Sequence, residues 1–177
     1  MKLLLSTAAV IGMFFVTSCS KKTTNNTVVQ DSIYYSTWTP LSMQFDNTDS
    51  VYYEDFSNKH ITASVLAHGA VLGYLGYVNS SKDTIAESPY DFSAFGVGQV
   101  FSVGAIEVFS PYPNDLTYSA SQGYGYLYRY VIIPANVLAN TSLKNLTQQQ
   151  LQKMSFTDVQ KAVQAGQAAS GNSVSLP

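Results

Sequence analysis

The chain has 177 residues, a formal net charge of −2 and a pI near 5.5. This weakly acidic balance gives no electrostatic reason to bind nucleic acid or anionic lipid, and we expect neither. Hydrophobic residues make up 46% of the chain, enough for one folded core. The single cysteine excludes an intramolecular disulfide, so stability has to come from that core.

The first segment, Met1 to Cys19, has the residue order of a secretory signal peptide. Lys2 gives a positive start, and the residues from Leu3 to Val16 are apolar apart from two hydroxyl side chains. This run is too short to span ~30 Å of hydrocarbon as a helix. Small residues follow it, and then comes the only cysteine. The pattern predicts a signal peptide over residues 1–18, with cleavage between Ser18 and Cys19.

Val16-Thr17-Ser18-Cys19 resembles the lipobox of bacterial lipoproteins. The resemblance implies that Cys19 is diacylated, becomes the first residue after cleavage and is then often acylated on its amine, for example with palmitate. A transmembrane anchor and an ordinary cleavage site are the alternatives, and the cysteine argues against both. Two or three acyl chains, at ~0.8 kcal/mol per buried methylene, hold a protein at a membrane without help from its folded domain.

Residues 19–31 are predicted to be the lipidated cysteine and a flexible tether, because Ser20 to Gln30 is polar and has no apolar period. In lipoproteins of the Bacteroidota type, an acidic run just after the cysteine accompanies export to the cell surface. Here Ser20-Lys21-Lys22 follows the cysteine, and the first acid is Asp31. That resemblance favours an anchor facing the periplasm, with the cell surface as the alternative. Ser20 rather than aspartate after the cysteine resembles the enteric-type sorting signal for the outer membrane.

Residues 32–166 are predicted to form one mainly β domain, a single antiparallel β-sandwich with short C-terminal helices. Aromatic and β-branched runs predict strands at Ile33–Thr39 (stopped by Pro40), Val51–Tyr53, Ala70–Val78, Gln99–Val103, Ala105–Phe109 and Tyr124–Ile133. Asp46-Asn47-Thr48-Asp49 is a predicted turn. The strands on either side of Gly104 form either a hairpin or one bent strand.

Two of these predicted strands have the clearest patterns of apolar residues. Ala70–Val78 is apolar on both faces, which favours a central position, and its Gly73 and Gly76 predict a bulge or a close backbone approach. Tyr124–Ile133 alternates, so one face is predicted to carry Tyr126, Tyr128, Tyr130 and Ile132, and the other Leu127, Arg129, Val131 and Ile133. The segments AHGAVLGYL and YGYLYRYVII also resemble small uncharacterised lipoproteins of Bacteroidota, which implies no activity.

Helices are expected in three places. Thr62 to His68 reads as two turns, with Thr62 as N-cap and Gly69 as the C-terminal glycine. Near the C-terminus, Thr147 with Gln150 and Ser155 with Asp158 fit capping boxes. Leu146, Leu151 and Met154 are predicted to face the core from one short helix, and Phe156, Val159 and Val163 from a second that ends near Gly166. Residues 167–177 are predicted to be a disordered tail.

Few residues have side chains and spacings suited to catalysis or metal binding, and we expect no catalytic residue, no metal and no cofactor. His60 and His68 are eight residues apart, which is not the spacing of a helical zinc pair. A serine–histidine pair distant in sequence stays open. Adjacent Glu54 and Asp55 are predicted to point to opposite faces of a strand. Together with Asp46 and Asp49 they form either a calcium loop or, as we favour, a solvated acidic loop.

Arg129, the only arginine, is predicted to pair with a carboxylate such as Glu107 or to cover an edge; binding an anion or stacking on tyrosines is the alternative. The tyrosines are expected mainly in the core, with a minority surface patch able to stack on sugar rings. Asp31-Ser32-Ile33, Asp49-Ser50-Val51 and Asp83-Thr84-Ile85 resemble Bacteroidota O-glycosylation sites, although ordinary turns at strand starts explain them better.

The sequence therefore predicts a lipid-anchored, non-enzymatic protein of the bacterial cell envelope. We expect it to bind an envelope protein or a polysaccharide. The two alternatives are a secreted hydrolase with an unrecognised site and a structural envelope or pilus-type protein. A histidine within reach of serine and aspartate in a cleft would favour the hydrolase, and a long unpaired edge strand would favour the structural protein.

Overall fold

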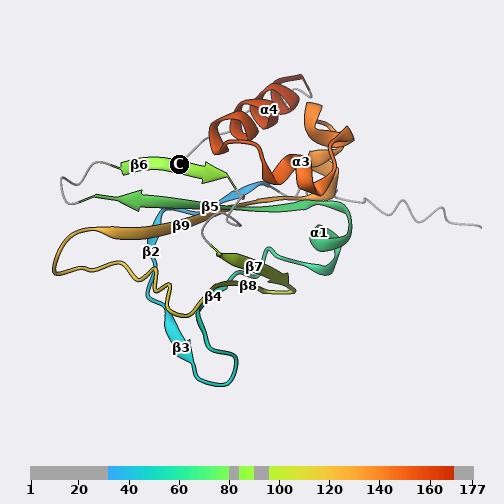
Figure 1. The fold of residues 1–177 in the computed structure, drawn as a ribbon. Coiled ribbons are helices and arrows are strands. Elements are labelled where there is room, and N and C mark those ends of the chain that lie inside the picture. Colours follow the sequence, from blue (N-terminus) through green and yellow to red (C-terminus); the bar gives the residue numbers. More distant parts are fainter. Residues whose placement is uncertain (1–31, 80–83, 90–95, 170–177) are drawn as a thin grey trace, which may run out of the picture.

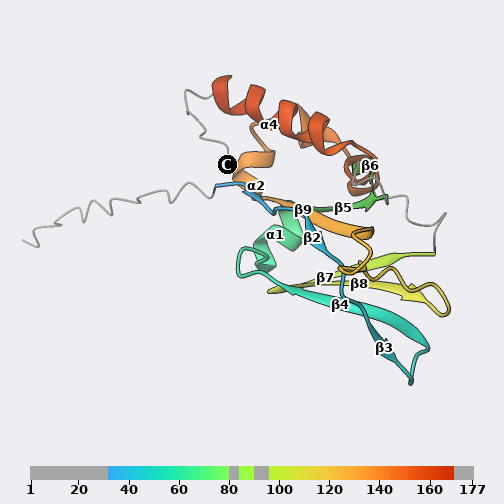
Figure 2. The same cartoon turned by 90° about the vertical axis from the view of Figure 1, so that its left-hand side faces the viewer.

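The computed structural model describes residues 32–79, 84–89 and 96–169, with the backbone alone for 84–89 and Ala169. The predicted signal peptide, Cys19, the tether and residues 170–177 lie outside the described residues. The described chain forms two antiparallel sheets that pack face to face, with helices on the outer face of one sheet (Figures 1 and 2). The predicted β-sandwich with short C-terminal helices is confirmed.

The first sheet has the order β1-β9-β5-β6, and β2 also pairs with β9. Its strands are β1 (Tyr34–Tyr35), β2 (Thr39–Pro40), β5 (Ala70–Val78), β6 (Thr84–Pro89) and β9 (Gly125–Ile133). β5 pairs with β9 along its whole length, from Ala70 opposite Ile133 to Val78 opposite Gly125. The predicted central position of β5 is confirmed, because β6 lies on its other side.

The single strand predicted over residues 33–39 is wrong, since the structure has two short strands there. Ser36 causes the break: its hydroxyl accepts the backbone N–H of Tyr130 at 2.7 Å, while its own N–H donates to the Tyr130 carbonyl. Pro40 does not stop the strand but belongs to β2. An edge strand tolerates proline because no further strand needs its missing N–H.

The second sheet has the order β3-β4-β8-β7. Its strands are β3 (Gln44–Asp46), β4 (Val51–Ser57), β7 (Gly98–Ser102) and β8 (Ala105–Pro111). β4 is longer than the predicted strand over 51–53, because all of its residues find partners on β8. β7 and β8 form a hairpin around Gly104, whose φ of 83° suits glycine. The hairpin is thus the correct one of the two predicted arrangements.

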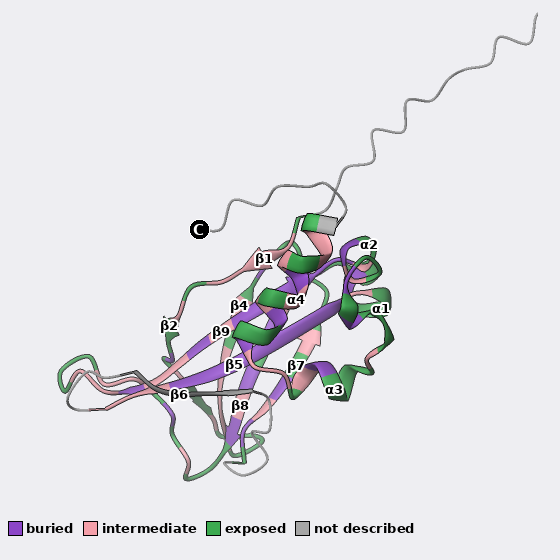
Figure 3. Cartoon of the chain, turned by 90° about the horizontal axis from the view of Figure 1, so that it is seen from above, coloured by how far each residue is buried: buried purple, intermediate pink, exposed green. Residues whose placement is uncertain are grey.

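The alternation predicted for β9 is confirmed. Tyr128, Tyr130 and Ile132 pack between the sheets against residues of β8, whereas Val131 and Ile133 face the helical layer. Figure 3 shows the resulting burial, with much of β5 and β9 enclosed beneath the helices. The predicted bulge is present at Gly76, where the pairing with β6 shifts between Leu75 and Tyr77. The group that approaches Gly76 is a side chain and not a backbone, since a Cβ there would lie about 3 Å from the Trp38 ring.

The helices are α1 (Ala63–His68), α2 (Ala135–Leu138), the 3₁₀ helix η2 (Ser142–Asn145), α3 (Gln148–Gln152) and α4 (Phe156–Ala169). Thr62 caps α1 as predicted, its hydroxyl accepting the N–H of Val65 at 3.2 Å. The Thr147–Gln150 capping box is present at α3, and the Ser155 hydroxyl accepts the N–H of Asp158 at 3.1 Å. Among the described helices, none is long and apolar enough to cross a membrane.

The second C-terminal helix does not end near Gly166 as predicted, since α4 continues to Ala169. Gly166 serves a different purpose. A Cβ there would lie 2.6 Å from the Asn140 carbonyl oxygen and 3.0 Å from the Cα of Thr141. The glycine therefore lets α4 pack closely on the loop before η2, and residues 167–169 belong to the helix. Phe156, Val159 and Val163 of α4 are buried as predicted.

Candidate binding site

Three aromatic side chains gather at the end of the second sheet. Phe45 on β3 lies opposite Tyr52 on β4, with ring centroids 4.9 Å apart. Tyr112, just beyond β8, completes the group at 5.5 Å from the Phe45 ring and 6.4 Å from the Tyr52 ring. Phe45 is 39% exposed and Tyr112 62% exposed. We call these three residues the aromatic patch.

The aromatic patch is held by backbone hydrogen bonds. The turn between β3 and β4 is fixed by Asp46, whose Oδ1 accepts the N–H of Thr48 at 2.7 Å. The N–H of Tyr112 donates to the carbonyl of Ser50 in the same turn at 3.1 Å. Tyr112 is therefore tied to the hairpin that carries the other two rings. The β3–β4 hairpin extends away from the helical layer (Figures 1 and 2).

Hairpin stability explains only part of this arrangement. A cross-strand aromatic pair such as Phe45 and Tyr52 contributes about 0.2–1 kcal/mol to a hairpin without any ligand. Tyr112 adds a third ring that remains mostly in solvent. Contiguous exposed aromatic surface is characteristic of interaction sites, where tyrosine is enriched among the residues that contribute most to binding.

A carboxylate stands beside the aromatic patch on β4. Glu54 follows Tyr52 by two residues, so the two side chains share one face of the strand. Glu54 Oε2 accepts the N–H of Ser42 at 2.6 Å. Partial burial raises the pKa of the Glu54 carboxyl, and the Ser42 hydrogen bond opposes that rise. The candidate site therefore combines the apolar surface of three aromatic rings with one carboxylate, that of Glu54, which accepts hydrogen bonds.

The histidines lie apart from one another. His60 stacks on Tyr34, with ring centroids 5.3 Å apart. His68 ends α1 and borders a pocket of about 240 Å³. The other residues lining that pocket, none of them a serine or a carboxylate, are Ala135, Leu138, Ala139, Lys144 and Asn145. The condition that would favour a hydrolase is not met at this pocket.

Arg129 does not pair with Glu107 as predicted. Glu107 is exposed on β8 in the second sheet, whereas the Arg129 guanidinium lies 3.4 Å from the centroid of Phe156 and 4.3 Å from that of Trp38. The structure thus shows stacking on aromatic rings, although the rings are not the tyrosines we expected. Pairing of Arg129 with a carboxylate other than Glu107 stays a prediction. The planar guanidinium suits this position because it stacks on ring faces.

The acidic residues of the hairpin face separate partners. Glu54 and Asp55 are adjacent on β4. In the pairing of β4 with β8, Glu54 lies opposite buried Val108, and Asp55 lies opposite exposed Glu107. Within the described part of the chain, no three histidine, cysteine, aspartate or glutamate residues are placed to hold a metal ion. Of the three glycosylation-like sequences, Asp49-Ser50-Val51 spans the end of the β3–β4 turn and the first residue of β4, whereas Asp31 and Asp83 are outside the described residues.

Comparison with known proteins finds no matching protein-family model, no matching curated protein and no matching solved structure. The aromatic patch therefore has to be interpreted from its own geometry. The sequence predicts a minority tyrosine surface but does not point to these three residues, because no strand pattern predicts β3. One signal was present: Tyr112 stands between two prolines, outside any regular strand pattern.

Proposed function

We propose that this protein is a lipid-anchored, non-enzymatic protein of the bacterial cell envelope that binds an envelope protein or polysaccharide through the aromatic patch. The cluster of Phe45, Tyr52 and Tyr112, in which Phe45 and Tyr112 are exposed and Tyr52 is half-buried, is the observation that carries the binding role. The sequence Val16 to Cys19 supports the anchor, since a lipidated cysteine after a signal peptide fixes the chain to a membrane.

The position of the aromatic patch fits such an anchor. The first described strand, β1, pairs with Val131 and Ile132 at the end of β9 that leads into α2, whereas β3 lies at the opposite end of the domain (Figure 2). A protein tethered through the residues before Ser32 presents the aromatic patch away from its membrane. The tether's Ser20-Lys21-Lys22 start supports an outer-membrane anchor facing the periplasm, with the cell surface as the alternative.

Photo-crosslinking in intact cells tests the binding role. A benzoylphenylalanine replaces Tyr112 in the full chain, and a second strain carries it at Val103, which is 65% exposed in the β7–β8 turn outside the aromatic patch. We expect a discrete adduct at position 112 that Phe45→Ala weakens, and none at position 103. Protease digestion and periodate oxidation of the adduct then separate a protein from a polysaccharide. Equal adducts at both positions, or none at 112, would contradict the proposal.

A further inference from the structure

The aromatic patch continues the inner face of the second sheet beyond the core. Phe45 lies opposite Tyr52, and Tyr52 lies opposite Ser110. Ser110 is fully buried, and it shares its face of β8 with the core residue Val108. Tyr112 follows Ser110 by two residues and so continues this face. The rings of Phe45 and Tyr112 therefore extend the apolar inner face into solvent, where a ligand can reach them.

The three rings can act on one ligand group together. The planes of Tyr52 and Tyr112 are nearly parallel, 17° apart, and Phe45 is inclined to them by 50° and 58°. Their centroids are 4.9–6.4 Å apart, so one group fits within about 6 Å of all three, the reach of a cation–π contact. The face of an aromatic ring carries partial negative charge and attracts a cation.

The two segments that carry these rings are acidic. Residues 44–57 and 105–115 contain no lysine, arginine or histidine. Their acidic residues are Asp46, Asp49, Glu54, Asp55, Glu107 and Asp115. Glu54 shares a strand face with Tyr52, and Asp49 lies in the turn of the same hairpin. Charges at a surface act over about 10 Å at 0.1 M salt, so their negative potential extends over the aromatic patch.

We infer that the aromatic patch binds a cationic side chain of a partner protein, an arginine in preference to a lysine. The inference rests on the proposed function and names the class of partner. A planar guanidinium stacks on ring faces, as that of Arg129 does on Trp38 and Phe156 in this chain. Its N–H groups also donate to carboxylates such as that of Glu54. A neutral polysaccharide has no charge for the carboxylates to attract, and they repel an anionic one.

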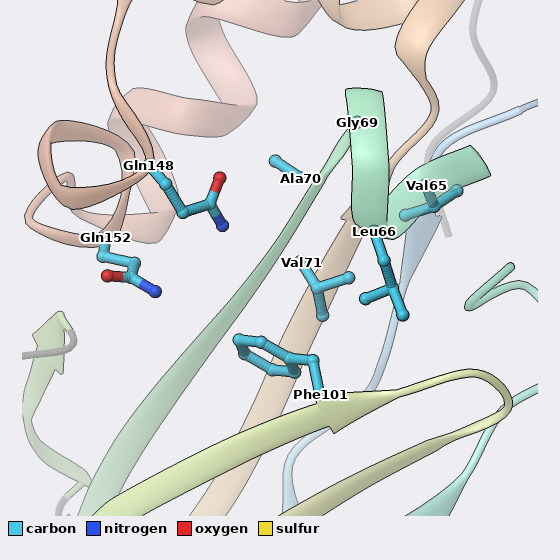
Figure 4. A pocket seen from close by; sticks show the side chains of 8 residues that line it. All are labelled: Val65, Leu66, Gly69, Ala70, Val71, Phe101, Gln148 and Gln152. Atoms are coloured by element: carbon cyan, nitrogen blue, oxygen red, sulfur yellow. The ribbon is translucent and has the colours of Figure 1, made fainter. Parts of the chain in front are cut away.

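A pocket of about 290 Å³ offers a cation a different environment (Figure 4). It lies between α1, β5, β7 and α3, and Phe101 is the one aromatic residue that lines it. Its other lining residues carry no charge. A cation in this pocket would meet one ring and no carboxylate. Phe101 is therefore a suitable control position for the rings of the aromatic patch.

Nuclear magnetic resonance of the full chain in detergent micelles, with isotope-labelled tyrosine rings, tests the inference. The probe is an end-capped pentapeptide with arginine between glycine and serine residues. Its twin carries citrulline, the uncharged isostere of arginine, and maltohexaose represents a neutral polysaccharide. The ring resonances of Tyr52 and Tyr112 report binding. In low salt the arginine peptide should bind more tightly than the citrulline peptide by about threefold or more, as an exposed cation–π contact provides. High salt should reduce this difference.

Three variants of the full chain locate the binding. Tyr112→Leu should weaken binding of the arginine peptide, because leucine is apolar but has no ring face. Phe101→Leu makes the same kind of change in the pocket and should leave binding unchanged. Glu54→Gln should reduce the preference for arginine over citrulline and leave binding of the citrulline peptide unchanged, since it removes a charge but no ring.

Equal binding of the two peptides by the native chain, or binding of neither, overturns the inference without recourse to any variant. So does a loss with Phe101→Leu that equals the loss with Tyr112→Leu. Stronger shifts of the Tyr52 and Tyr112 rings by maltohexaose than by the arginine peptide would assign the aromatic patch to a polysaccharide instead. In each of these cases an adduct at position 112 in cells leaves the proposed binding role intact, whereas absence of that adduct removes both.

Discussion

The hydroxyl of Tyr128 on β9 donates to Oε1 of Gln99 on β7 at 2.6 Å, and so links the two sheets inside the core. Both residues are buried, so water does not replace the bond when either partner is removed. Leaving one buried partner without its hydrogen bond costs about 1–3 kcal/mol of stability. Replacing both partners by apolar side chains of similar shape changes the stability very little.

We therefore predict that Tyr128→Phe and Gln99→Leu each lower the free energy of unfolding by about 1–3 kcal/mol. The double variant should lose clearly less than the sum of the two single losses, because no polar partner is left behind. Urea unfolding of the native chain and the three variants measures this cycle. Strict additivity of the losses would show that the two side chains are not coupled.

Gly73 on β5 leaves the space in which this hydrogen bond forms. A Cβ at this position would overlap both Gln99 Oε1 and the Tyr128 hydroxyl. Gly73→Ala should therefore cost about 1–3 kcal/mol, as overpacking of a core does. The matched change is Gly104→Ala, where a Cβ meets nothing within 4 Å and only the φ of 83° opposes it. Thermal unfolding compares the two; a smaller loss for Gly73→Ala would contradict the packing described here.

Phe156 joins the helical layer to the first sheet. Its ring makes edge-to-face contacts with the rings of Tyr35 and Tyr74, at centroid distances of 5.7 and 5.5 Å. The Arg129 guanidinium lies over the Phe156 ring. Phe156→Ala should cost ~3–5 kcal/mol, as for other buried aromatic side chains. Thr157→Ala, at an exposed neighbouring position, is the control in the same urea titration. A loss below ~1 kcal/mol for Phe156→Ala would show that the helices are peripheral.

Glu54 makes stability depend on pH. Burial raises the pKa of its carboxyl above the ordinary 4.5, so the folded chain binds this proton more tightly than the unfolded chain does. Its contribution to stability is then fully present below the unfolded pKa and is lost as pH rises through the folded pKa. Glu54→Gln should remove this loss and still accept the Ser42 N–H, so the variant should be more stable than the native chain at pH 7.

Unfolding midpoints measured from pH 3 to pH 8 test the role of Glu54. The difference between Glu54→Gln and the native chain should shrink as pH falls through the raised folded pKa toward 4.5, and it should change no further below 4.5. Asp55→Asn is the control, because Asp55 is exposed next to Glu54 on β4. A native chain more stable than Glu54→Gln at pH 7 would show that the charged carboxylate is favoured in the fold.

The elements that the sequence predicted well are those with a strong local pattern. Ala70–Val78 is a long apolar run and β9 alternates over its whole length, so both were placed with little error. Thr62 and Thr147 were identified because a capping hydrogen bond forms within three residues. The short strands β3 and β6 were missed, since a strand of three to six residues depends on the partner opposite it.

The aromatic patch was missed for the same reason. Phe45 and Tyr112 are exposed because the first sheet does not cover them. The spacing of residues in the sequence does not predict how the two sheets overlap. The face on which Arg129 lies was predicted correctly from the alternation of β9. Its partners Trp38 and Phe156 come from opposite ends of the described chain, and only the tertiary fold brings them together.

Metabolic labelling with palmitate, combined with membrane fractionation, tests the central claim that Cys19 anchors this protein. The native chain should incorporate label, stay with the membrane in high salt and enter detergent. Each methylene of an acyl chain that is buried in the membrane stabilises the attachment by ~0.8 kcal/mol. Salt would release a protein held by surface charge, which is screened within ~10 Å at 0.1 M. Cys19→Ser should incorporate no label, because serine cannot form the thioether. A labelled Cys19→Ser variant, or a native chain that fractionates as fully soluble, would contradict the anchor and the tethered binding role built on it.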